Sequence, residues 1–278
     1  MKRSVVVGLL LLGALVTPSD AADRGVVIQG KLFEPERLEL LVGDTITWAN
    51  DDAVTHTVTA DDGTFDSGDL KSGASFSATF AKPGRTIYHC AIHRFMTGEI
   101  DVFALALSGP LDPVRIDTQF ELSGLAPRDA GFVTVERRGD DGGFTPVAET
   151  TVAPDGHFRV SVPALVSADY RAVEGALASS IVHVRVSPRV MLRARRNGGV
   201  VQLEGWAAPA QPGMPVALQA YSRERFAWFR VARAHFDAGS RVRFRLRPHG
   251  KLRLRLALLR ASQGLVGGTS DVVVVAPR

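Results

Sequence analysis

The sequence predicts an all-β protein, and three observations support this. Apolar and polar residues alternate over short runs, as at Leu38, Leu40 and Val42, which is the period of a half-buried strand. Turn-forming pairs such as Gly43-Asp44 separate these runs. No run of helical period reaches a useful length. The 27 glycines and 15 prolines are not periodic, which is typical of many short strands joined by turns.

Residues 1–21 have the pattern of a secretory signal. Lys2 and Arg3 form a basic start, residues 5–16 form an apolar run, and Ser19-Asp20-Ala21 is a small-x-small cleavage site. The apolar run is too short to span a bilayer comfortably, and no second one follows. We therefore expect an exported protein, periplasmic or extracellular, with no transmembrane segment in the mature chain.

Residues 22–105 are predicted to form the first domain. Strand patterning begins near Val26 and continues, with the turn at Gly43, as far as Trp48. Three further strands are expected, the first of them where apolar and polar residues alternate again, and the last two are joined by the loop 90–96. They are 75–80, 86–89 and 98–103.

This loop holds the only cysteine of the chain, Cys90. His93 and Met96 follow it at intervals of three residues, and His56 lies upstream, beyond the strand that ends near Trp48. Two imidazoles, one thiolate and one thioether suit a trigonal copper site with a long axial methionine. A single cysteine cannot form an internal disulfide, and a bound metal would protect its thiol in an oxidising compartment.

Other interpretations of these residues remain open from the sequence alone. Cys90 could be a buried structural cysteine, and Met96 could belong to the core. Zinc suits the set less well than copper, because a structural zinc site normally uses four strong ligands. The simultaneous spacing of His56, Cys90, His93 and Met96 favours copper.

Residues 26–105 resemble the cupredoxins, the small blue type 1 copper proteins, and within them amicyanin and plastocyanin. The resemblance implies a Greek-key β-sandwich with one copper ion between two loops at one end. It also implies one-electron transfer between a redox donor and a redox acceptor. The residues that carry the resemblance are Phe33, Pro35, Val42, Gly43, Asp44, Trp48, Asn50, His56, Pro83, Gly84, Tyr88, His89, Cys90, His93, Phe95, Met96 and Gly98.

The resemblance implies roles for three neighbours of the ligands. Asn50 resembles the residue whose contacts tie the two ligand loops together, although it could be an ordinary turn residue at a strand end. Phe95 and Arg94 flank His93 and are expected on the surface through which electrons leave. Amicyanin has proline at the positions of Arg94 and Ile92, so the N–H of Ile92 is a candidate donor to the thiolate.

The histidine pattern argues against an enzyme. Multicopper oxidases need several His-x-His motifs and a histidine on each side of the cysteine, but the seven histidines include no such motif, and Ala91 follows Cys90. No nucleophilic triad, phosphate loop or carboxylate pair supports catalysis. We expect no catalytic residue. The alternative to electron transfer is an envelope copper-binding or adhesion module without a dedicated redox partner.

The remainder of the chain is predicted to form two β-sandwich modules, residues 106–186 and 187–278. They resemble Ig-like or fibronectin-like modules in pattern and turn spacing. Their boundaries follow an internal repeat, in which each copy has two similar segments and ends in an apolar strand. The matching segments are 144–148 with 226–232, 155–160 with 237–244, and 181–186 with 271–276.

The last module is strongly basic. From Val186 onward 17 Lys and Arg accompany four acidic residues, a net charge of +13, whereas residues 22–185 carry −10. Alternation predicts a hairpin with one cationic face, either solvated or bound to an anionic envelope polymer or acidic protein. Nucleic acid is not expected, because the chain is predicted to be exported and no aromatic residue is expected there. The cationic residues are Arg241, Arg243, Arg245, Arg247, Lys251, Arg253 and Arg255.

Overall fold

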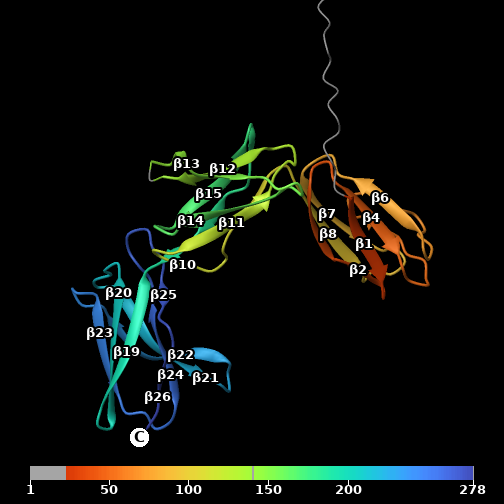
Figure 1. The fold of residues 1–278 in the computed structure, drawn as a ribbon. Helices are drawn as coiled ribbons and strands as arrows, with labels where there is room; N and C mark the ends of the chain where they lie inside the picture. The colour runs from red at the N-terminus through yellow and green to blue at the C-terminus, as the bar shows by residue number, and fades with distance from the viewer. Residues whose placement is uncertain (1–22, 140, 278) are drawn as a thin grey trace, which may run out of the picture. The chain divides into compact units, whose positions relative to one another are not determined.

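The computed structural model describes residues 23–139 and 141–277, so the predicted signal at residues 1–21 lies outside the described residues. Within them the secondary structure consists of 26 strands and no α-helix (Figure 1), which confirms the all-β prediction. The chain divides between Phe103 and Ala104 into two compact units. Each unit is described by itself.

The first unit is a sandwich of two four-stranded sheets. One sheet has the order β2 (Leu32–Glu34), β1 (Asp23–Gln29), β4 (Thr45–Asn50) and β6 (Ser75–Thr79). The other has the order β3 (Arg37–Leu41), β8 (Thr97–Phe103), β7 (Gly84–His89) and β5 (Thr59–Ala60). β1 runs parallel to β4 and β3 parallel to β8, whereas all other neighbours are antiparallel.

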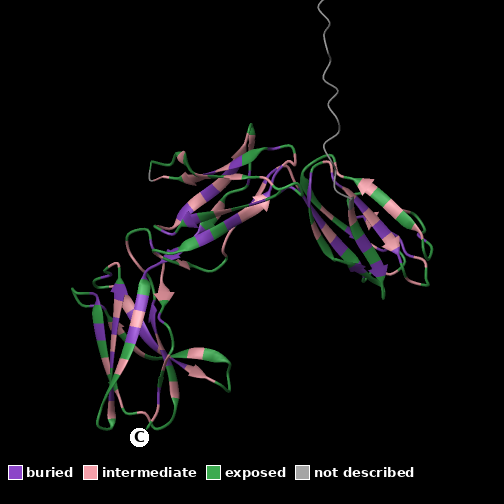
Figure 2. Ribbon diagram, in the orientation of Figure 1, coloured by how far each residue is buried: buried purple, intermediate pink, exposed green. Residues whose placement is uncertain are grey.

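The core between these sheets is aromatic. In β4 every second residue is buried, which gives the alternation of colours along the strand in Figure 2 and points Trp48 inward. Tyr88 of β7 is also fully buried, and its ring centroid lies 5.6 Å from that of Trp48 and 4.8 Å from that of Phe33. Edge-to-face rings at this spacing attract each other beyond the burial of their area. This packing fixes the end of β7, directly before Cys90.

The second unit contains two copies of one strand arrangement. The first copy pairs β14 (His157–Pro163), β11 (Gln119–Leu125) and β9 (Ala106–Ser108) in one sheet. Its other sheet contains β13 (Phe144–Thr151), β12 (Phe132–Arg138), β15 (Ala168–Glu174) and β16 (Leu177–Ala178), with β17 (Val182–Val184) also on β15. β10 (Val114–Arg115) pairs in parallel with β18 (Val186–Ser187).

The second copy repeats this order. Its three-stranded sheet is β19 (Arg189–Asn197), β20 (Val200–Ala208) and β23 (Arg241–Leu246). Its other sheet is β22 (Ala227–His235), β21 (Pro215–Ser222), β24 (Leu252–Leu258) and β25 (Gly268–Thr269), with β26 (Val273–Val275) also on β24. The equivalent strands β12 and β21 even share a register shift against their neighbours. The internal repeat is therefore a repeat of topology.

Each copy has its own buried core, one containing Leu122 and Tyr170 and the other Leu218 and Leu254. Leu265, from the end of the chain, belongs to the first of these cores. The two copies thus share one compact unit. The boundary at 186/187 and the likeness to Ig or fibronectin modules stay predictions.

The predicted cationic hairpin is wrong. β23 pairs with β20 and β24 with β21, so the two strands lie in different sheets. Alternation holds within each strand, since Arg243 is exposed where Val242 is buried, and Arg253 is exposed where Leu254 is buried. Alternation specifies which face of a strand is buried but not which strand pairs with it. The seven cationic residues therefore do not share one face.

Gly98 of β8 lies opposite Tyr88 in the second sheet of the first unit. A Cβ atom at Gly98 would meet Cζ of Tyr88 at 2.2 Å and its hydroxyl oxygen at 2.4 Å. The Tyr88 ring has no room to retreat, because it is fully buried against Trp48 and Phe33. This position therefore requires glycine.

We predict that Gly98→Ala lowers the free energy of unfolding of the first unit by about 1–3 kcal/mol, the usual cost of overpacking a core. Hydrogen exchange of the amides in β7 and β8 measures this unit separately. Gly25→Ala in β1 is the matched control, because a Cβ atom there meets nothing within 4 Å. Equal exchange rates in the two variants would contradict the prediction.

Candidate metal centre

Three side chains converge beyond the end of β7. Cys90 directly follows this strand, His93 lies in the loop to β8, and His56 lies between β4 and β5. Cys90 Sγ is 3.7 Å from His56 Nδ1 and 3.8 Å from His93 Nδ1, and the two nitrogens are 3.2 Å apart. His56 and Cys90 are fully buried, whereas His93 is half-buried. The sequence prediction that these residues meet is thus matched by the geometry.

The triangle has the size and chemistry of a metal site. Nitrogen and sulfur ligands held at about 2.0–2.3 Å from a shared first-row metal ion lie roughly 3.5 Å from one another, and the three sides range from 3.2 to 3.8 Å. Among the described His, Cys, Asp and Glu residues no fourth donor joins the group. Two imidazoles and one thiolate without a fourth strong ligand suit copper better than structural zinc. The residues present therefore fit a copper ion.

Met96 belongs to the same buried cluster as Cys90 and is 1% exposed. Its backbone closes the ligand loop on itself, because Met96 N–H donates to His93 O at 2.9 Å and Cys90 N–H donates to Met96 O at 3.2 Å. Burial and loop closure are consistent with a weak axial ligand. Its role as the fourth donor stays a prediction.

Thr57 joins the two ligand loops, a role that the sequence did not indicate. Its backbone N–H donates to Cys90 Sγ at 3.3 Å, and its hydroxyl oxygen accepts from Ala91 N–H at 2.7 Å. Among the hydrogen bonds of the described residues, none runs from Ile92 N to the thiolate, so the expected Ile92 donor is replaced by Thr57. In the sequence, the only indication of this role was that Thr57 directly follows His56.

Asn50 is fully buried and organises the His56 side of the site. Its Nδ2 donates to Val54 O at 2.9 Å and to Leu70 O at 2.8 Å, while its Oδ1 accepts from Asp52 N–H at 3.0 Å. These bonds hold the segment that leads to His56. They do not reach the Cys90 loop, so the expected tie between loops is made by Thr57 instead.

Asp52 orients the His56 ring. Its Oδ2 is 3.0 Å from His56 Nε2, and its carboxylate accepts backbone N–H groups of Gly30 and Lys31 at 2.8 Å each. The Lys31 N–H in particular holds the pKa of Asp52 below its usual value. The ionised carboxylate favours a proton on Nε2, which leaves Nδ1 facing Cys90 as a metal donor.

His93 and Phe95 form the rim of the site. Partial burial, together with His56, lowers the pKa of His93, which favours the neutral form that a metal requires. The Phe95 ring lies 6.1 Å from the His93 ring and is 70% exposed, and Ile92, which precedes His93 in the chain, is 51% exposed. Arg94 is exposed as well. The predicted surface residues Arg94 and Phe95 are thus both exposed, and Phe95 lies against His93, the ligand candidate that approaches solvent.

The known proteins to which this chain is similar match the part that contains these metal-binding residues. The profile described as copper binding proteins, plastocyanin/azurin family, matches residues 25–103. Amicyanin of Paracoccus denitrificans is 34% identical over 91 residues, which are 30% of this chain and 70% of that protein. Amicyanin-alpha of Methylorubrum extorquens is 31% identical over 100 residues, which are 34% of this chain and 84% of that protein. The solved structure of a purple cupredoxin from Nitrosopumilus maritimus is 29% identical, covers 29% of this chain and 100% of its own, and has a TM-score of 0.27.

We predict that Cys90→Ser abolishes the intense visible absorption that Cu(II) gives with a thiolate ligand, while the circular dichroism of the sandwich is preserved. The adjacent His89→Gln is the matched control. His89 Nδ1 bonds to Asp61 at 2.6 Å and stands outside the donor triangle, so this variant should keep the band. A wild-type protein that stays colourless after copper loading would contradict the assignment.

Proposed function

The chain belongs, through residues 25–103, to the plastocyanin/azurin family of copper-binding proteins, and on this basis we propose that it is an exported one-electron carrier. In this proposal one copper ion is held by His56, Cys90, His93 and Met96. The observation that carries it is the triangle of two nitrogens and one sulfur, with sides of 3.2–3.8 Å, at the end of the sandwich.

Copper supplies a one-electron couple when it is bound to such a donor set. The chain's own contribution is to hold the metal-binding side chains in fixed positions. Thr57 fixes the sulfur, Asp52 fixes one imidazole, and Asn50 fixes the segment between them. A carrier needs this rigidity, because little rearrangement should accompany the change of charge at the site.

The rim provides a docking surface for redox partners. Phe95 and Ile92 are large apolar side chains exposed beside His93, the half-buried donor. Exposed apolar residues that surround a functional group are typical of protein-interaction sites. We propose that a donor and an acceptor protein each dock here, with His93 closest to them.

The exposed apolar rim favours an electron carrier over the alternative functions. A copper-binding or adhesion module without a redox partner needs the donors but no exposed apolar rim. We propose no enzymatic role, because His56 and Cys90 are fully buried and only His93 approaches solvent.

Export is the remaining part of the proposal and rests on residues 1–21, with their basic start, apolar run and cleavage site. Among the described residues, no helix is long and apolar enough to cross a membrane. An oxidising compartment would expose a free thiol to oxidation, and copper at Cys90 removes that liability.

The proposal is tested by loading the full chain with Cu(II), recording visible and EPR spectra, and following the protein through repeated cycles of voltammetry. We expect an intense charge-transfer band and a reversible couple with the metal retained. Release of copper on reduction would overturn the carrier function and favour the copper-binding module.

We predict that Asp52→Asn raises the reduction potential and weakens copper binding by roughly ten- to hundred-fold, the usual effect of removing a carboxylate behind a ligating histidine. The potential rises because a neutral amide favours Cu(II) less than a carboxylate does. Asp61→Asn, which changes a carboxylate bonded to His89 rather than to a donor, should leave both quantities unchanged. An equal shift in both variants would indicate a general charge effect.

We predict that Phe95→Asp slows electron exchange with a redox partner by about ten-fold or more, which corresponds to a loss of about 1.4 kcal/mol of docking free energy. The absorption spectrum should stay unchanged, because Phe95 contacts His93 only at the rim. Phe226, 84% exposed in the second unit, provides the matched control as Phe226→Asp. Stopped-flow kinetics measures the exchange, and equal rates for both variants would argue against docking at the rim.

A further inference from the structure

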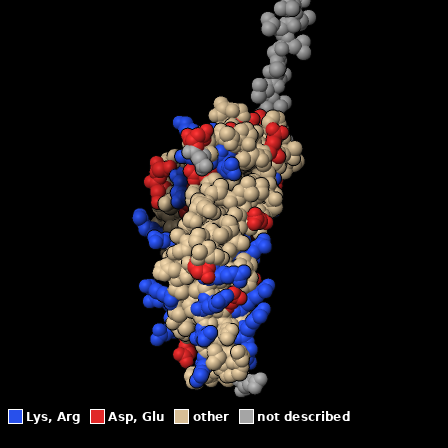
Figure 3. All heavy atoms as spheres, turned by 90° about the vertical axis from the view of Figure 1, so that its left-hand side faces the viewer, with Lys and Arg blue, Asp and Glu red and all other residues tan. Residues whose placement is uncertain are grey.

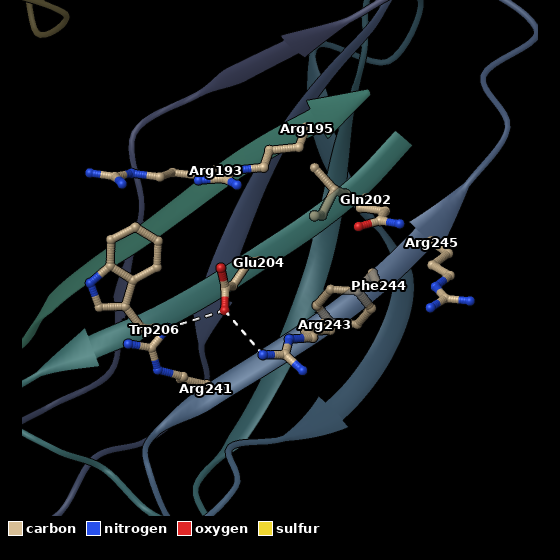
Figure 4. Close-up of a pocket in the computed structure, with 10 residues that line it drawn as sticks. Arg193, Arg195, Gln202, Glu204, Trp206, Arg241, Arg243, Phe244 and Arg245 are labelled. Atoms are coloured by element: carbon tan, nitrogen blue, oxygen red, sulfur yellow. Dashed lines mark hydrogen bonds and ion pairs between the residues drawn. The ribbon is translucent and has the colours of Figure 1, made fainter. Parts of the chain in front are cut away.

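The outer face of the β19–β20–β23 sheet carries a hollow of about 510 Å³ (Figure 4). Strand register places its residues in rows across the sheet. One row is Arg193, Glu204 and Arg243, and the next is Arg195, Gln202 and Arg245. Trp206 and Arg241 face each other in a third row. The edge strands β19 and β23 therefore present arginines on this face, and the central strand β20 presents Gln202, Glu204 and Trp206 between them.

This face has a large excess of positive charge. Glu204 is its single acidic lining residue and pairs with Arg241 at 3.1 Å and Arg243 at 3.6 Å. The other three arginines have no carboxylate within 4 Å among the described residues; they are Arg193, Arg195 and Arg245. In Figure 3 blue side chains crowd the lower part of the molecule, where these strands lie, with few red ones among them. An anionic ligand would complement this charge.

The spacing suits a linear ligand. Neighbouring strands lie about 4.8 Å apart, so the arginines of β19 and β23 form two rails roughly 10 Å from each other, with β20 between them. Along each strand, alternate residues repeat at about 6.8 Å. A chain lying over β20 can place acid groups against guanidinium groups on either side, where two parallel N–H donors match a carboxylate or sulfate.

Trp206 indicates which class of anionic polymer suits this face. The expectation of an arginine face without aromatic residues is wrong, because β20 brings this indole between the rails, with the Arg193 guanidinium 5.0 Å from its ring. The C–H face of a sugar ring packs on an aromatic plane, and Gln202 offers an amide to hydroxyl groups. An acidic peptide gains its main-chain bonds at a sheet edge rather than on a face. Single-stranded nucleic acid uses successive stacked aromatics, whereas one indole is present.

We propose that the outer face of β19–β20–β23 binds an anionic polysaccharide, with its carboxylate or sulfate groups on the arginine rails and a sugar ring on Trp206. This site is separate from the copper centre and does not depend on it. It assigns the second unit a role in attaching the chain to an acidic glycan.

The test is a titration of the full chain with polygalacturonate and with dextran sulfate, by calorimetry at low and near-physiological salt. We expect binding of at least one polymer that weakens steeply as salt rises, because each contact releases counterions. Fully methyl-esterified polygalacturonate, which keeps the sugar backbone without the charge, should bind at least about ten-fold more weakly. Equal binding of the esterified polymer, or no binding of either anionic polymer, would overturn the proposal.

Two sets of Arg→Gln substitutions test whether the polymer binds to this face. Replacing the rail residues Arg193, Arg195, Arg243 and Arg245 with Gln should lower the affinity at least about ten-fold and flatten the salt dependence. The matched control removes four exposed charges from the β22 region of the same copy and should change the affinity less than about two-fold. Its members are Arg223, Arg225, Arg230 and Arg233. Equal losses in both variants would show non-specific attraction and overturn the site. Arg193→Gln with Arg195→Gln serves if the fourfold rail variant fails to fold by circular dichroism.

The variant Trp206→Ala tests whether a sugar ring of the ligand packs on the indole. Loss of the indole should weaken polysaccharide binding by about ten-fold, as for loss of one stacking platform, while the slope of affinity against salt stays the same. Poly-aspartate and single-stranded DNA provide the competing classes. Binding of either as tightly as the polysaccharide, or no effect of Trp206→Ala on the polysaccharide, would overturn the assignment to a glycan.

Discussion

The two hydrogen bonds of Thr57 are the interaction on which the metal centre depends. Thr57 donates its backbone N–H to the Cys90 sulfur, and its hydroxyl oxygen accepts the N–H of Ala91. The bond to the sulfur is buried and the bond from Ala91 is partly buried; an unsatisfied buried group costs about 1–3 kcal/mol, so together the two bonds specify one relative position of the two loops. The core supports this arrangement, because Tyr88, packed on Trp48 and opposite Gly98, fixes the strand that ends directly before Cys90.

Much of the first unit was predictable from the sequence, because local patterns determine it. Alternation located β4 and β6 to within a few residues, β7 and β8 were expected at nearly their observed bounds, and the only cysteine with its spaced histidine marked the loop between the last two. Local patterns could not place His56, 34 positions before Cys90, beside the loop; its convergence with Cys90 and His93 was inferred from the donor chemistry and supported by the family resemblance. The repeated topology of the second unit was likewise visible as a repeat of sequence segments.

What the sequence could not supply was pairing between distant parts. Arginines alternate in β23 and β24 whether these strands form a hairpin or face each other from two sheets, because alternation reports burial only. The same limit hid Trp206, which reaches the arginines through the register of β20 with β23. It also misplaced the donor to the thiolate, since any nearby N–H could satisfy the sulfur and only the fold brings Thr57 there.

Leu265 lies near the end of the chain yet completes the core that surrounds Leu122. The segment is held there by backbone bonds, from Ser167 N–H to Gly264 O at 3.0 Å and from Val266 N–H to Val186 O at 2.8 Å. The chain thus returns from the last copy to the core of the one before it, so the first copy is not a self-contained stretch of sequence. A division of the chain near residue 187 would remove Leu265 from the core to which it belongs. The two copies are therefore expected to fold as one unit, whereas the boundary after Phe103 separates the copper domain from them.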